Sequence, residues 1–527
     1  MLKKARVALA VVFWLCITLL FLDFTGTLHH WLGWMAKIQF LPAVLALNVW
    51  VIVGLVLLTL IFGRIYCSVI CPLGVFQDGV AHLRARRSKM PYKYHKEMKV
   101  VRYGIWVAFV VCLVAGVHVV VSVLAPYSAY GRMVQNLLQP LYLWGNNLLA
   151  AISEHFGSYA FYEKEVWLKS VPSLIVAIIT LVVVVVLAHV GGREYCNSIC
   201  PVGTTLSFLS RFAAFRPMID HEKCKHCKQC ELHCKASCIA IGKDTEHIDY
   251  SRCVDCFNCI DTCKFGALKY RFVWKKEMHS PSARHDKNSG TPSNNSVTPS
   301  KNSGTPSNNS VTPSEASVSH GKRAFIAGTA VAVGAAAMKG VQAKAQSLGK
   351  VDGGFAEVLP KQAPEREVPL TPPGSVSVKH FYQHCTACQL CIAECPNNVL
   401  RPSSKADHLM QPEMSFDKGF CRPECTRCSE LCPTSAIKPI GREEKTQYHV
   451  GTAAVNRQLC IAEKKTSCGK CAQVCPSGAI QMVHVEDRGV EVPTVNEELC
   501  IGCGACEFYC PSRPVSAITV NGKHQHI

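Results

Sequence analysis

The spacing of the cysteines is the feature that most limits what this chain can fold into. The sequence has 31 cysteines in 527 residues, and 24 of them form six sets of four built around short C-x2-C or similar spacings. A small secreted protein would use so many cysteines for disulfides, but long cysteine-free stretches separate these sets. C-x2-C-x2-C-x3-C is the ligand spacing of [4Fe-4S] clusters. We therefore expect iron–sulfur clusters, with iron held through cysteine sulfurs.

Two sets with identical spacing follow the first 214 residues. They are Cys224, Cys227, Cys230, Cys234 and Cys253, Cys256, Cys259, Cys263. In two-cluster ferredoxins the fourth cysteine of each run binds the other cluster. We therefore expect Cys263 to join the first run and Cys234 to join the second. Zinc is the alternative ion, but zinc knuckles have no use for a third cysteine two residues further on.

The other four sets lie beyond residue 380. They are Cys385, Cys388, Cys391, Cys395; Cys421, Cys425, Cys428, Cys432; Cys460, Cys468, Cys471, Cys475; and Cys500, Cys503, Cys506, Cys510. A proline follows each fourth cysteine, whereas Lys235 and Lys264 stand at that position in the two earlier runs. The sets predict four further clusters, six [4Fe-4S] clusters in all.

Hydropathy predicts a membrane domain before the first cluster runs. Four stretches, at about 7–27, 40–63, 103–125 and 172–190, are apolar over the roughly 20 residues that a helix needs to cross a bilayer. Basic residues concentrate between the second and third stretches, so the positive-inside rule places that loop and the N-terminus in the cytoplasm. The formal charge of +19 counts cysteines as neutral. Cluster-bound thiolates would lower it, and we expect no nucleic-acid partner.

The membrane part contains an internal repeat. Gly63-Arg64-Ile65-Tyr66-Cys67, followed by Cys71-Pro72, reappears as Gly192-Arg193-Glu194-Tyr195-Cys196, followed by Cys200-Pro201. The repeat predicts two helical hairpins related by an axis along the membrane normal, with both C-x3-C-P motifs at the cytoplasmic face. Cys67, Cys71, Cys196 and Cys200 could bind a further cluster, act as redox-active dithiols or form structural turns. Their spacing does not decide between these.

Two histidines in the apolar stretches are candidates for a proton acceptor in quinol oxidation. Ionisable groups inside a membrane are usually functional. His118 lies toward the outer end of the third stretch and His189 toward the inner end of the fourth. His189 is the preferred candidate because it is close in sequence to Cys196. His29 and His30 are expected to be structural, and Cys16, Cys112 and Cys238 receive no role.

The predicted fold class is an α-helical membrane domain, with four transmembrane helices as two repeated hairpins, joined to α+β ferredoxin-like modules. The predicted domains are the membrane domain 1–214, a cytoplasmic two-cluster module 215–275, a tandem-repeat linker 276–315, a signal-like segment 316–346 and a four-cluster domain 347–527. Residues 321–326 resemble a twin-arginine signal, with Lys322 in place of the first arginine. The export that this implies would make the last domain periplasmic; a short packing helix is the alternative.

These motifs together resemble two protein families of periplasmic nitrate reductase systems. Residues 1 to about 275 resemble the membrane quinol dehydrogenase component, NapH, and residues 316–527 resemble the ferredoxin component, NapG. The resemblance implies a protein of the bacterial inner membrane that oxidises menaquinol or ubiquinol. Its electrons would reach a periplasmic c-type cytochrome and nitrate reductase subunits. It also implies that the first C-terminal run exchanges its fourth ligand with the fourth run, and the second with the third.

Related membrane cores offer alternatives. Regulators of nitrous oxide respiration begin with a large flavin-binding domain, whereas the first apolar stretch here starts near Val7. Copper-handling assembly proteins for cytochrome oxidase lack a four-cluster exported domain.

The sequence leaves open how electrons cross the membrane. If two clusters are cytoplasmic and four periplasmic, electrons must cross the bilayer, and the sequence has no haem-ligating motif to carry them.

Overall fold

The computed structural model describes residues 1–87, 92, 94–242, 245–273, 350–351, 357–464, 466–486 and 489–526. The chain divides into two compact units. The first consists of Met1–Val273 and Lys361–Ile527, and the second of Trp274–Pro360. The described part of the second unit holds the two-residue strands β5 (Lys350–Val351) and β6 (Glu357–Val358). The predicted linker and signal-like segment, 276–315 and 316–346, lie outside the described residues.

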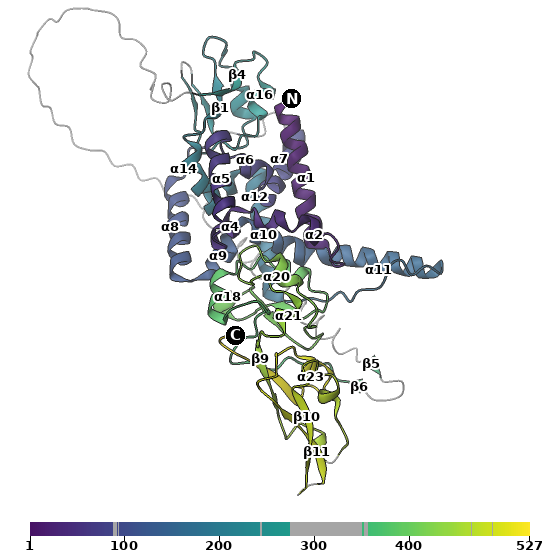
Figure 1. The fold of residues 1–527 in the computed structure, drawn as a ribbon. Helices are drawn as coiled ribbons and strands as arrows, with labels where there is room; N and C mark the ends of the chain where they lie inside the picture. Colours follow the sequence, from purple (N-terminus) through teal and green to yellow (C-terminus); the bar gives the residue numbers. More distant parts are fainter. Residues whose placement is uncertain are drawn as a thin grey trace, which may run out of the picture. The chain divides into compact units, whose positions relative to one another are not determined.

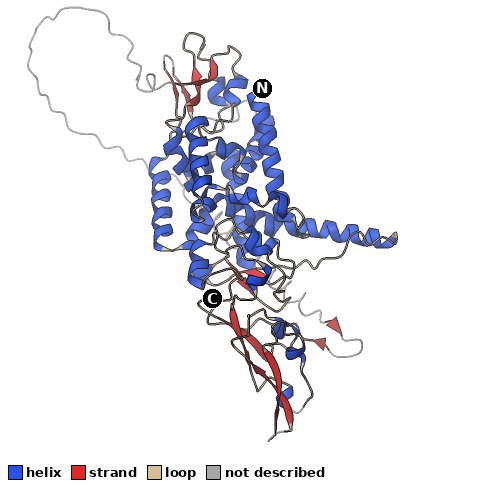
Figure 2. Cartoon of the chain, in the orientation of Figure 1, coloured by secondary structure: helices blue, strands red, loops and turns tan. Residues whose placement is uncertain are grey.

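Helices make up the N-terminal part of the first unit (Figure 2). Two of them, α1 (Leu2–Leu22) and α12 (Val171–Gly191), are long and apolar enough to cross a membrane. Both expose large apolar side chains, such as Leu15 on α1 and Val182 on α12. Apolar side chains left facing outward along a whole helix fit a lipid environment better than water.

The second and third apolar stretches are each broken into two helices. The second becomes α4 (Phe40–Leu45) and α5 (Val49–Phe62), and the Asn48 side chain accepts a hydrogen bond from the first turn of α5. The third becomes α8 (Lys99–Ala115) and α9 (His118–Leu124), which part at Gly116 with φ +77°. Two helices of crossing length are therefore present among the described residues. Four crossings stay a prediction.

The internal repeat appears as a repeated order of helices, most of which Figure 1 labels. The helix α5 is followed by α6 (Ile65–Val69) and α7 (Pro72–Arg87), and α12 is followed by α13 (Glu194–Ser198) and α14 (Pro201–Ser210). Gly63 ends α5 and Gly192 ends α12, with φ of +73° and +69°. This backbone region favours glycine, which explains why both copies begin with it.

The remaining helices of this part connect the repeats. They are α2 (His29–Leu32), α3 (Trp34–Lys37), α10 (Pro126–Met133), the π-helix η1 (Val134–Leu138) and α11 (Gln139–His155).

Three small α+β modules carry the six cysteine runs. Each places a β-hairpin between two consecutive runs, and each run ends in a short helix. The first, inner module has β1 (Phe215–Ile219), α15 (Gln229–Leu232), β2 (Ile239–Ile241), β3 (Glu246–Ile248), α16 (Asn258–Thr262) and β4 (Leu268–Phe272). The middle module has α18 (Val378–His384), α19 (Leu390–Ala393), β7 (Leu400–Pro402), η3 (Ala406–His408), β8 (Pro412–Met414), α20 (Arg427–Leu431) and α21 (Arg442–Lys445). The last has β9 (Gly451–Val455), η4 (Ala462–Lys464), α22 (Lys470–Gln473), β10 (Ile480–Val485), β11 (Val490–Val495), α23 (Ala505–Tyr509) and β12 (Ile518–Gly522).

Every strand pair is antiparallel, and the inner and last modules have the same plan. In the inner module β1 pairs with β4 and β2 with β3. In the last, β9 pairs with β12 and β10 with β11. The middle module has the hairpin pair β7 and β8. Each hairpin brings two consecutive runs back together, because an antiparallel turn reverses the chain.

The modules contact opposite ends of the two long helices. The inner module meets the start of α1 through the ion pair of Lys3 with Asp261 at 2.7 Å. It meets the end of α12 where the backbone N–H of Arg193 donates to a carbonyl of the module at 2.7 Å. The middle module meets the other ends: Arg427 donates to the carbonyl of Thr25, just after α1. One buried hydrophobic core runs from the inner module through the helices to residues of the middle module.

Candidate functional site

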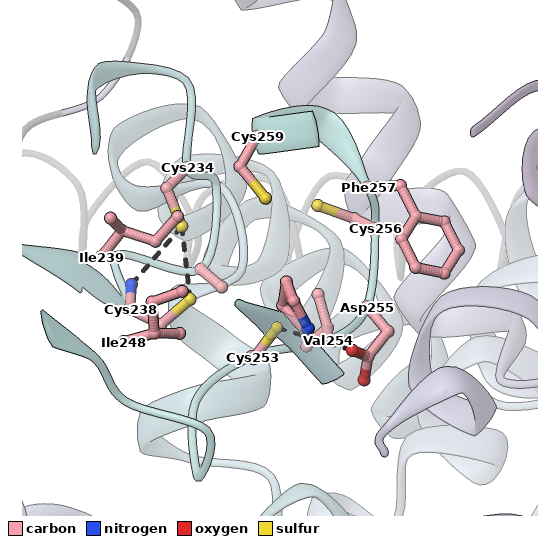
Figure 3. A pocket seen from close by; sticks show the side chains of 12 residues that line it. Cys234, Cys238, Ile239, Ile248, Cys253, Val254, Asp255, Cys256, Phe257 and Cys259 are labelled. Atoms are coloured by element: carbon pink, nitrogen blue, oxygen red, sulfur yellow. Dashed lines mark hydrogen bonds between the residues drawn. The ribbon is translucent and has the colours of Figure 1, made fainter. Parts of the chain in front are cut away.

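The inner module forms two cysteine-lined pockets. Cys253, Cys256 and Cys259 line one of them together with Cys234 from the other run (Figure 3). Cys224, Cys227 and Cys230 line the second together with Cys263. This grouping agrees with the exchange of fourth cysteines expected from the sequence. It arises because β2 and β3 fold the second run back onto the first, so that α15 packs on α16.

The cysteine loops wrap around their pockets because residues between the cysteines have a left-handed backbone conformation. His226 and Lys228 have φ of +52° and +57°, and the same positions of the fourth C-terminal run are Gly502 and Gly504. This curl turns backbone N–H groups toward sulfur, as where Ala387 N–H donates to Cys385 Sγ at 3.4 Å. Such bonds stabilise thiolates and tune the potential of a bound cluster. The two glycines were the sequence signal for this loop shape.

A fifth sulfur, which sequence reasoning left without a role, faces the first pocket. Cys238 Sγ lies 3.4 Å from Cys234 Sγ, and its backbone N–H donates to the same sulfur at 3.4 Å. Asp255 lines this pocket as well, and burial raises the pKa of its carboxyl to about 7. Both groups lie next to the expected ligands, and Asp255 Oδ1 accepts from Cys253 Sγ at 3.7 Å.

The C-terminal runs pair differently from the expectation. Cys421, Cys425 and Cys428 line a pocket with Cys395, so the second run takes the fourth cysteine of the first. Burial, followed by Cys388 and then Cys432, raises the pKa of the Cys385 thiol, so the exchange is reciprocal.

The third and fourth runs make the corresponding exchange. Cys460, Cys468 and Cys471 line a pocket with Cys510. Cys475 is among the thiols, after burial, Cys503 and Cys500, that raise the pKa of Cys506. The implied exchange of first with fourth and second with third is therefore wrong. The physical reason is the hairpin between consecutive runs, which packs α19 on α20 and α22 on α23.

The four C-x3-C-P cysteines come together between the two repeats. We refer to Cys67, Cys71, Cys196 and Cys200 as the tetracysteine site. All four are at least 95% buried. Their thiols lie close enough for each to affect the ionisation of the others: burial first, then Cys196 and Cys67, raise the pKa of Cys71. Helix-end turns alone would not require four buried sulfurs at one point.

Two buried arginines cross between the repeats at this site. Arg64 Nη2 lies 4.0 Å from Cys67 Sγ and donates to the carbonyl of Cys196 at 3.2 Å. Arg193 Nη1 lies 3.8 Å from Cys196 Sγ and donates to the carbonyl of Cys67 at 2.8 Å. The arrangement is symmetric, and it places two fixed positive charges beside four thiols.

Two glycines make room for these crossings. A Cβ atom on Gly74 would lie 2.2 Å from the carbonyl oxygen of Cys67, and one on Gly203 would lie 2.3 Å from that of Cys196. Backbone atoms at that distance cannot move aside. The glycine two residues after each C-P pair is thus a packing requirement of the tetracysteine site.

The inner module is fixed to the tetracysteine site by a charged cluster around Asp78. The Asp78 carboxylate pairs with Arg193, Lys235 and Arg6, each at 2.7 Å. Burial opposes its ionisation, but these three cations hold the pKa of Asp78 well below its usual range. Lys235 is the residue that replaces the usual proline after Cys234. The departure from the ferredoxin pattern therefore serves docking.

The middle module is fixed to the helices by a second polar cluster. Asn136 Nδ2 donates to Gln389 Oε1 at 3.0 Å, and Gln389 donates to Ser173 Oγ at 2.7 Å. All three side chains are buried. A Cβ on Gly131 would lie 2.4 Å from the carbonyl oxygen of Cys388, so the first cysteine loop rests directly on α10.

The two candidate histidines have very different surroundings. His118 is 7% exposed, begins α9 and has no hydrogen-bond partner for Nδ1 among the described residues. The helix α9 packs against η3 of the middle module. His189 is exposed near the end of α12, and its backbone carbonyl accepts from Arg84. Neither assignment as a quinol-site residue is tested by this geometry.

Known families match the chain in two places. A family described as a 4Fe-4S binding domain matches residues 43–91 and 173–218, and one described as a 4Fe-4S dicluster domain matches 464–513. The second match covers the fourth C-terminal run and all of the third except Cys460, in agreement with their pairing. The first contains the tetracysteine site and none of the ferredoxin runs. The folds, pockets and matches define an iron–sulfur protein for electron transfer, whose ferredoxin cysteine motifs bind [4Fe-4S] clusters.

Individual relatives narrow the class. The ferredoxin-type protein NapF of Escherichia coli (strain K12) is 32% identical over 34% of this chain and 99% of NapF. The ferredoxin-type protein NapH of the same strain is 26% identical over 46% of this chain and 72% of NapH. The methylamine utilization ferredoxin-type protein MauM of Methylobacillus flagellatus is 32% identical over 29% of this chain and 67% of MauM. The chain therefore belongs to the ferredoxin-type protein family of NapF, with more distant likeness to NapH.

Proposed function

We propose that this protein oxidises a membrane quinol, menaquinol or ubiquinol, and delivers the electrons to a periplasmic acceptor. The observation that carries the proposal is the contact of ferredoxin modules with opposite ends of α1 and α12. If these helices cross the inner membrane, the inner module is cytoplasmic and the middle and last modules are periplasmic. Such a chain carries one-electron centres on both sides of one bilayer.

The tetracysteine site supports an electron path between the two sides. Four buried thiols suit an iron–sulfur cluster, and the match to a 4Fe-4S binding domain covers all four. A [4Fe-4S] core bound by four thiolates is doubly negative in its oxidised form, and the guanidinium groups of Arg64 and Arg193 balance that charge where water is excluded. We therefore assign a seventh centre to the site, and we assign six clusters to the ferredoxin runs.

Buried side chains connect this site to the middle module. Arg132 is fully buried and donates to the carbonyl of Ser122 at 2.7 Å and to that of Ala387, in the first cysteine loop, at 3.5 Å. Burial lowers the pKa of Arg132 to about 10, and Tyr195, which neighbours Cys196, and Cys388 act in the opposite direction. A packed, dry connection of this kind keeps the path short and water out of it.

His118 is the better candidate for the quinol proton. It is buried beside the middle module and has a free ring nitrogen, whereas the His189 side chain is exposed. A neutral imidazole that accepts a proton as the quinol loses electrons would couple the two transfers. This choice reverses the preference expected from sequence.

The periplasmic acceptor follows from the family resemblance. We assign a c-type cytochrome and nitrate reductase subunits to that role. The likeness to MauM, which is by name a methylamine utilization protein, makes an acceptor in methylamine utilization the second candidate.

Anaerobic reduction by a quinol tests the function. The purified protein in detergent is mixed with menadiol, and cluster reduction is followed by visible absorbance and EPR. We expect menadiol to reduce the clusters of the C-terminal modules. The double variant Cys67→Ser, Cys196→Ser should stop reduction of the inner module, because the tetracysteine site lies between that module and His118. Cys112→Ser, a cysteine outside the motifs, is the matched control. Clusters that dithionite reduces but menadiol does not would overturn the proposal.

Protease digestion of spheroplasts tests the sidedness. We expect protease to cut the middle and last modules in intact spheroplasts. It should cut the inner module only after the spheroplasts are lysed. Protection of residues 361–527 in intact spheroplasts would place all clusters on one side and would contradict the transmembrane path.

A further inference from the structure

A buried carboxylate lies where the middle module meets the end of α1. Glu394 follows α19 directly and is 1% exposed. Neither Oε1 nor Oε2 has a hydrogen-bond partner among the described residues. A buried carboxylate without partners is costly, and either a bound cation or a proton relieves that cost.

Two further ligand-type groups face Glu394 from the loop after α1. Ligand atoms of Asp23, His29 and Glu394 lie within 4.8 Å of one another. Asp23 is 6% exposed, and its carboxylate is held in place by the backbone N–H groups of Gly26 at 2.8 Å and Leu28 at 2.7 Å.

The histidine is oriented for ligation. Nε2 of His29 lies 3.3 Å from Glu430 Oε2, and Nδ1 is buried without a partner among the described residues. A proton on Nε2, donated to Glu430, leaves the lone pair of Nδ1 free. This carboxylate–imidazole arrangement is how proteins fix the tautomer of a metal-binding histidine.

The nearby positive charge does not balance the site. Arg427 lies beside the loop, and its Nη2 donates to the carbonyl of Thr25 at 2.7 Å. The Asp23 carboxylate already accepts from Thr25 Oγ1 and from the N–H groups of Gly26, Leu28 and His29, whereas Glu394 accepts from no group among the described residues. A divalent cation between the two carboxylates would satisfy Glu394 and also use the imidazole nitrogen that lacks a partner there.

We propose that Asp23, His29 and Glu394 form a binding site for a divalent first-row cation that accepts oxygen and nitrogen ligands, such as Mn²⁺, Fe²⁺ or Zn²⁺. The cation clamps the loop after α1 to the middle module, one residue from Cys395. This site is separate from the iron–sulfur clusters and does not rest on the proposed electron transfer.

The test uses Mn²⁺, which binds thiolates weakly and therefore avoids the cysteines. Full-length protein with its clusters intact is treated with a mild chelator, desalted and titrated with Mn²⁺, and free Mn²⁺ is read by EPR. We expect one tight site per chain, with nitrogen coupling from an imidazole in the spectrum of the bound ion. Glu394→Gln, which keeps the side-chain shape, should weaken binding at least tenfold and leave the cluster absorbance unchanged.

The controls separate this site from its surroundings. Glu424→Gln removes a carboxylate from the neighbouring opening that His29 and Glu430 also line; Glu424 is not among the three ligands, and this variant should bind Mn²⁺ like the native protein. His29→Gln should lose both affinity and nitrogen coupling. Equal affinity in the native protein and Glu394→Gln, or no bound Mn²⁺ at all, would overturn the proposal. Binding lost in His30→Gln but kept in Glu394→Gln would also overturn it, since it would assign the ion to the exposed group of His29, His30 and Glu430.

Discussion

The Arg64 guanidinium donates a hydrogen bond of 3.2 Å to the backbone carbonyl of Cys196, from one repeat of the N-terminal helical part to the other. Arg193 makes the equivalent bond to Cys67 in the opposite direction. Each arginine is fully buried and also lies near a thiol of its own repeat. Hydrogen bonds and buried positive charge from the two arginines therefore hold the two halves of the tetracysteine site together.

Replacing Arg64 by Gln should weaken the tetracysteine site selectively. The change removes a buried positive charge and leaves the Cys196 carbonyl short of a donor, at a cost of about 1–3 kcal/mol. We expect loss of the iron held there, measured as iron and acid-labile sulfide per chain, with the ferredoxin EPR signals retained. Arg86→Gln, at an exposed position of α7, is the control. Full iron content in Arg64→Gln would show that the charge is not needed.

Gly74→Ala should disrupt the same site by sterics alone. The new Cβ would lie 2.2 Å from the carbonyl oxygen of Cys67, so the backbone of α6 must move. Gly79→Ala is a close control, because it is on the same helix and its Cβ would meet nothing within 4 Å. Removing a helical glycine there should stabilise the protein by about 0.5–1 kcal/mol. Thermal unfolding of both variants measures the difference; equal midpoints would contradict the packing argument.

Asp78→Asn should loosen the inner module from the helices. Removing one partner of a buried ion pair typically costs about 3–5 kcal/mol, and here three cations lose their counter-charge. Hydrogen exchange over residues 215–272 should increase. Asp261→Asn breaks the exposed pair with Lys3 and should change stability by at most about 1 kcal/mol. Unchanged exchange in Asp78→Asn would show that the docking does not depend on this cluster.

The same carboxylate predicts a pH dependence. The pKa of Asp78 is depressed in the folded state, so its contribution to stability is present above the unfolded value of about 4. It is lost as the pH falls from that value toward the folded pKa. The native protein should lose stability on acidification below about pH 4 more steeply than Asp78→Asn. Parallel curves for the two proteins would remove Asp78 from the explanation.

Paired serine variants should distinguish the two ligand exchanges in the C-terminal modules. Cys460 and Cys510 line one pocket, so changing both should cost one cluster, about four iron atoms. Changing Cys385 and Cys510 should cost two clusters, about eight iron atoms, because these residues belong to different modules. The exchange expected from the sequence gives the opposite order. Iron analysis of both double variants decides between them.

His118→Gln should slow quinol oxidation, whereas His189→Gln should not. The ring nitrogen Nδ1 of the buried His118 has no partner in the part of the chain that the structure describes, and His189 is exposed. We expect the rate of cluster reduction by menadiol to fall at least tenfold in His118→Gln, with dithionite reduction unchanged. The reverse ranking would move the quinol site to the other end of α12.

Local patterns in the sequence were enough to predict an iron–sulfur protein. Cysteine spacing predicted the cluster-binding runs and the exchange within the inner module, because ligand spacing and the ferredoxin crossover are local properties. The repeat around Cys67 and Cys196 was equally plain, since two copies of one pattern need no structure to be seen. Hydropathy located the apolar stretches but not the breaks at Asn48 and Gly116, which depend on capping and backbone conformation.

The contacts between the cysteine runs, the two repeats and the modules could be seen in the tertiary structure alone. The pairing of Cys395 with the second run follows from a hairpin that returns the chain to its neighbour, and spacing cannot show which neighbour that is. The reciprocal contacts of Arg64 and Arg193, the use of Lys235 to reach Asp78, and the meeting of His29 with Glu394 join residues from 126 to more than 350 positions apart. Such contacts depend on packing over the whole unit, because a buried charge is placed by every element around it and not by its sequence neighbours.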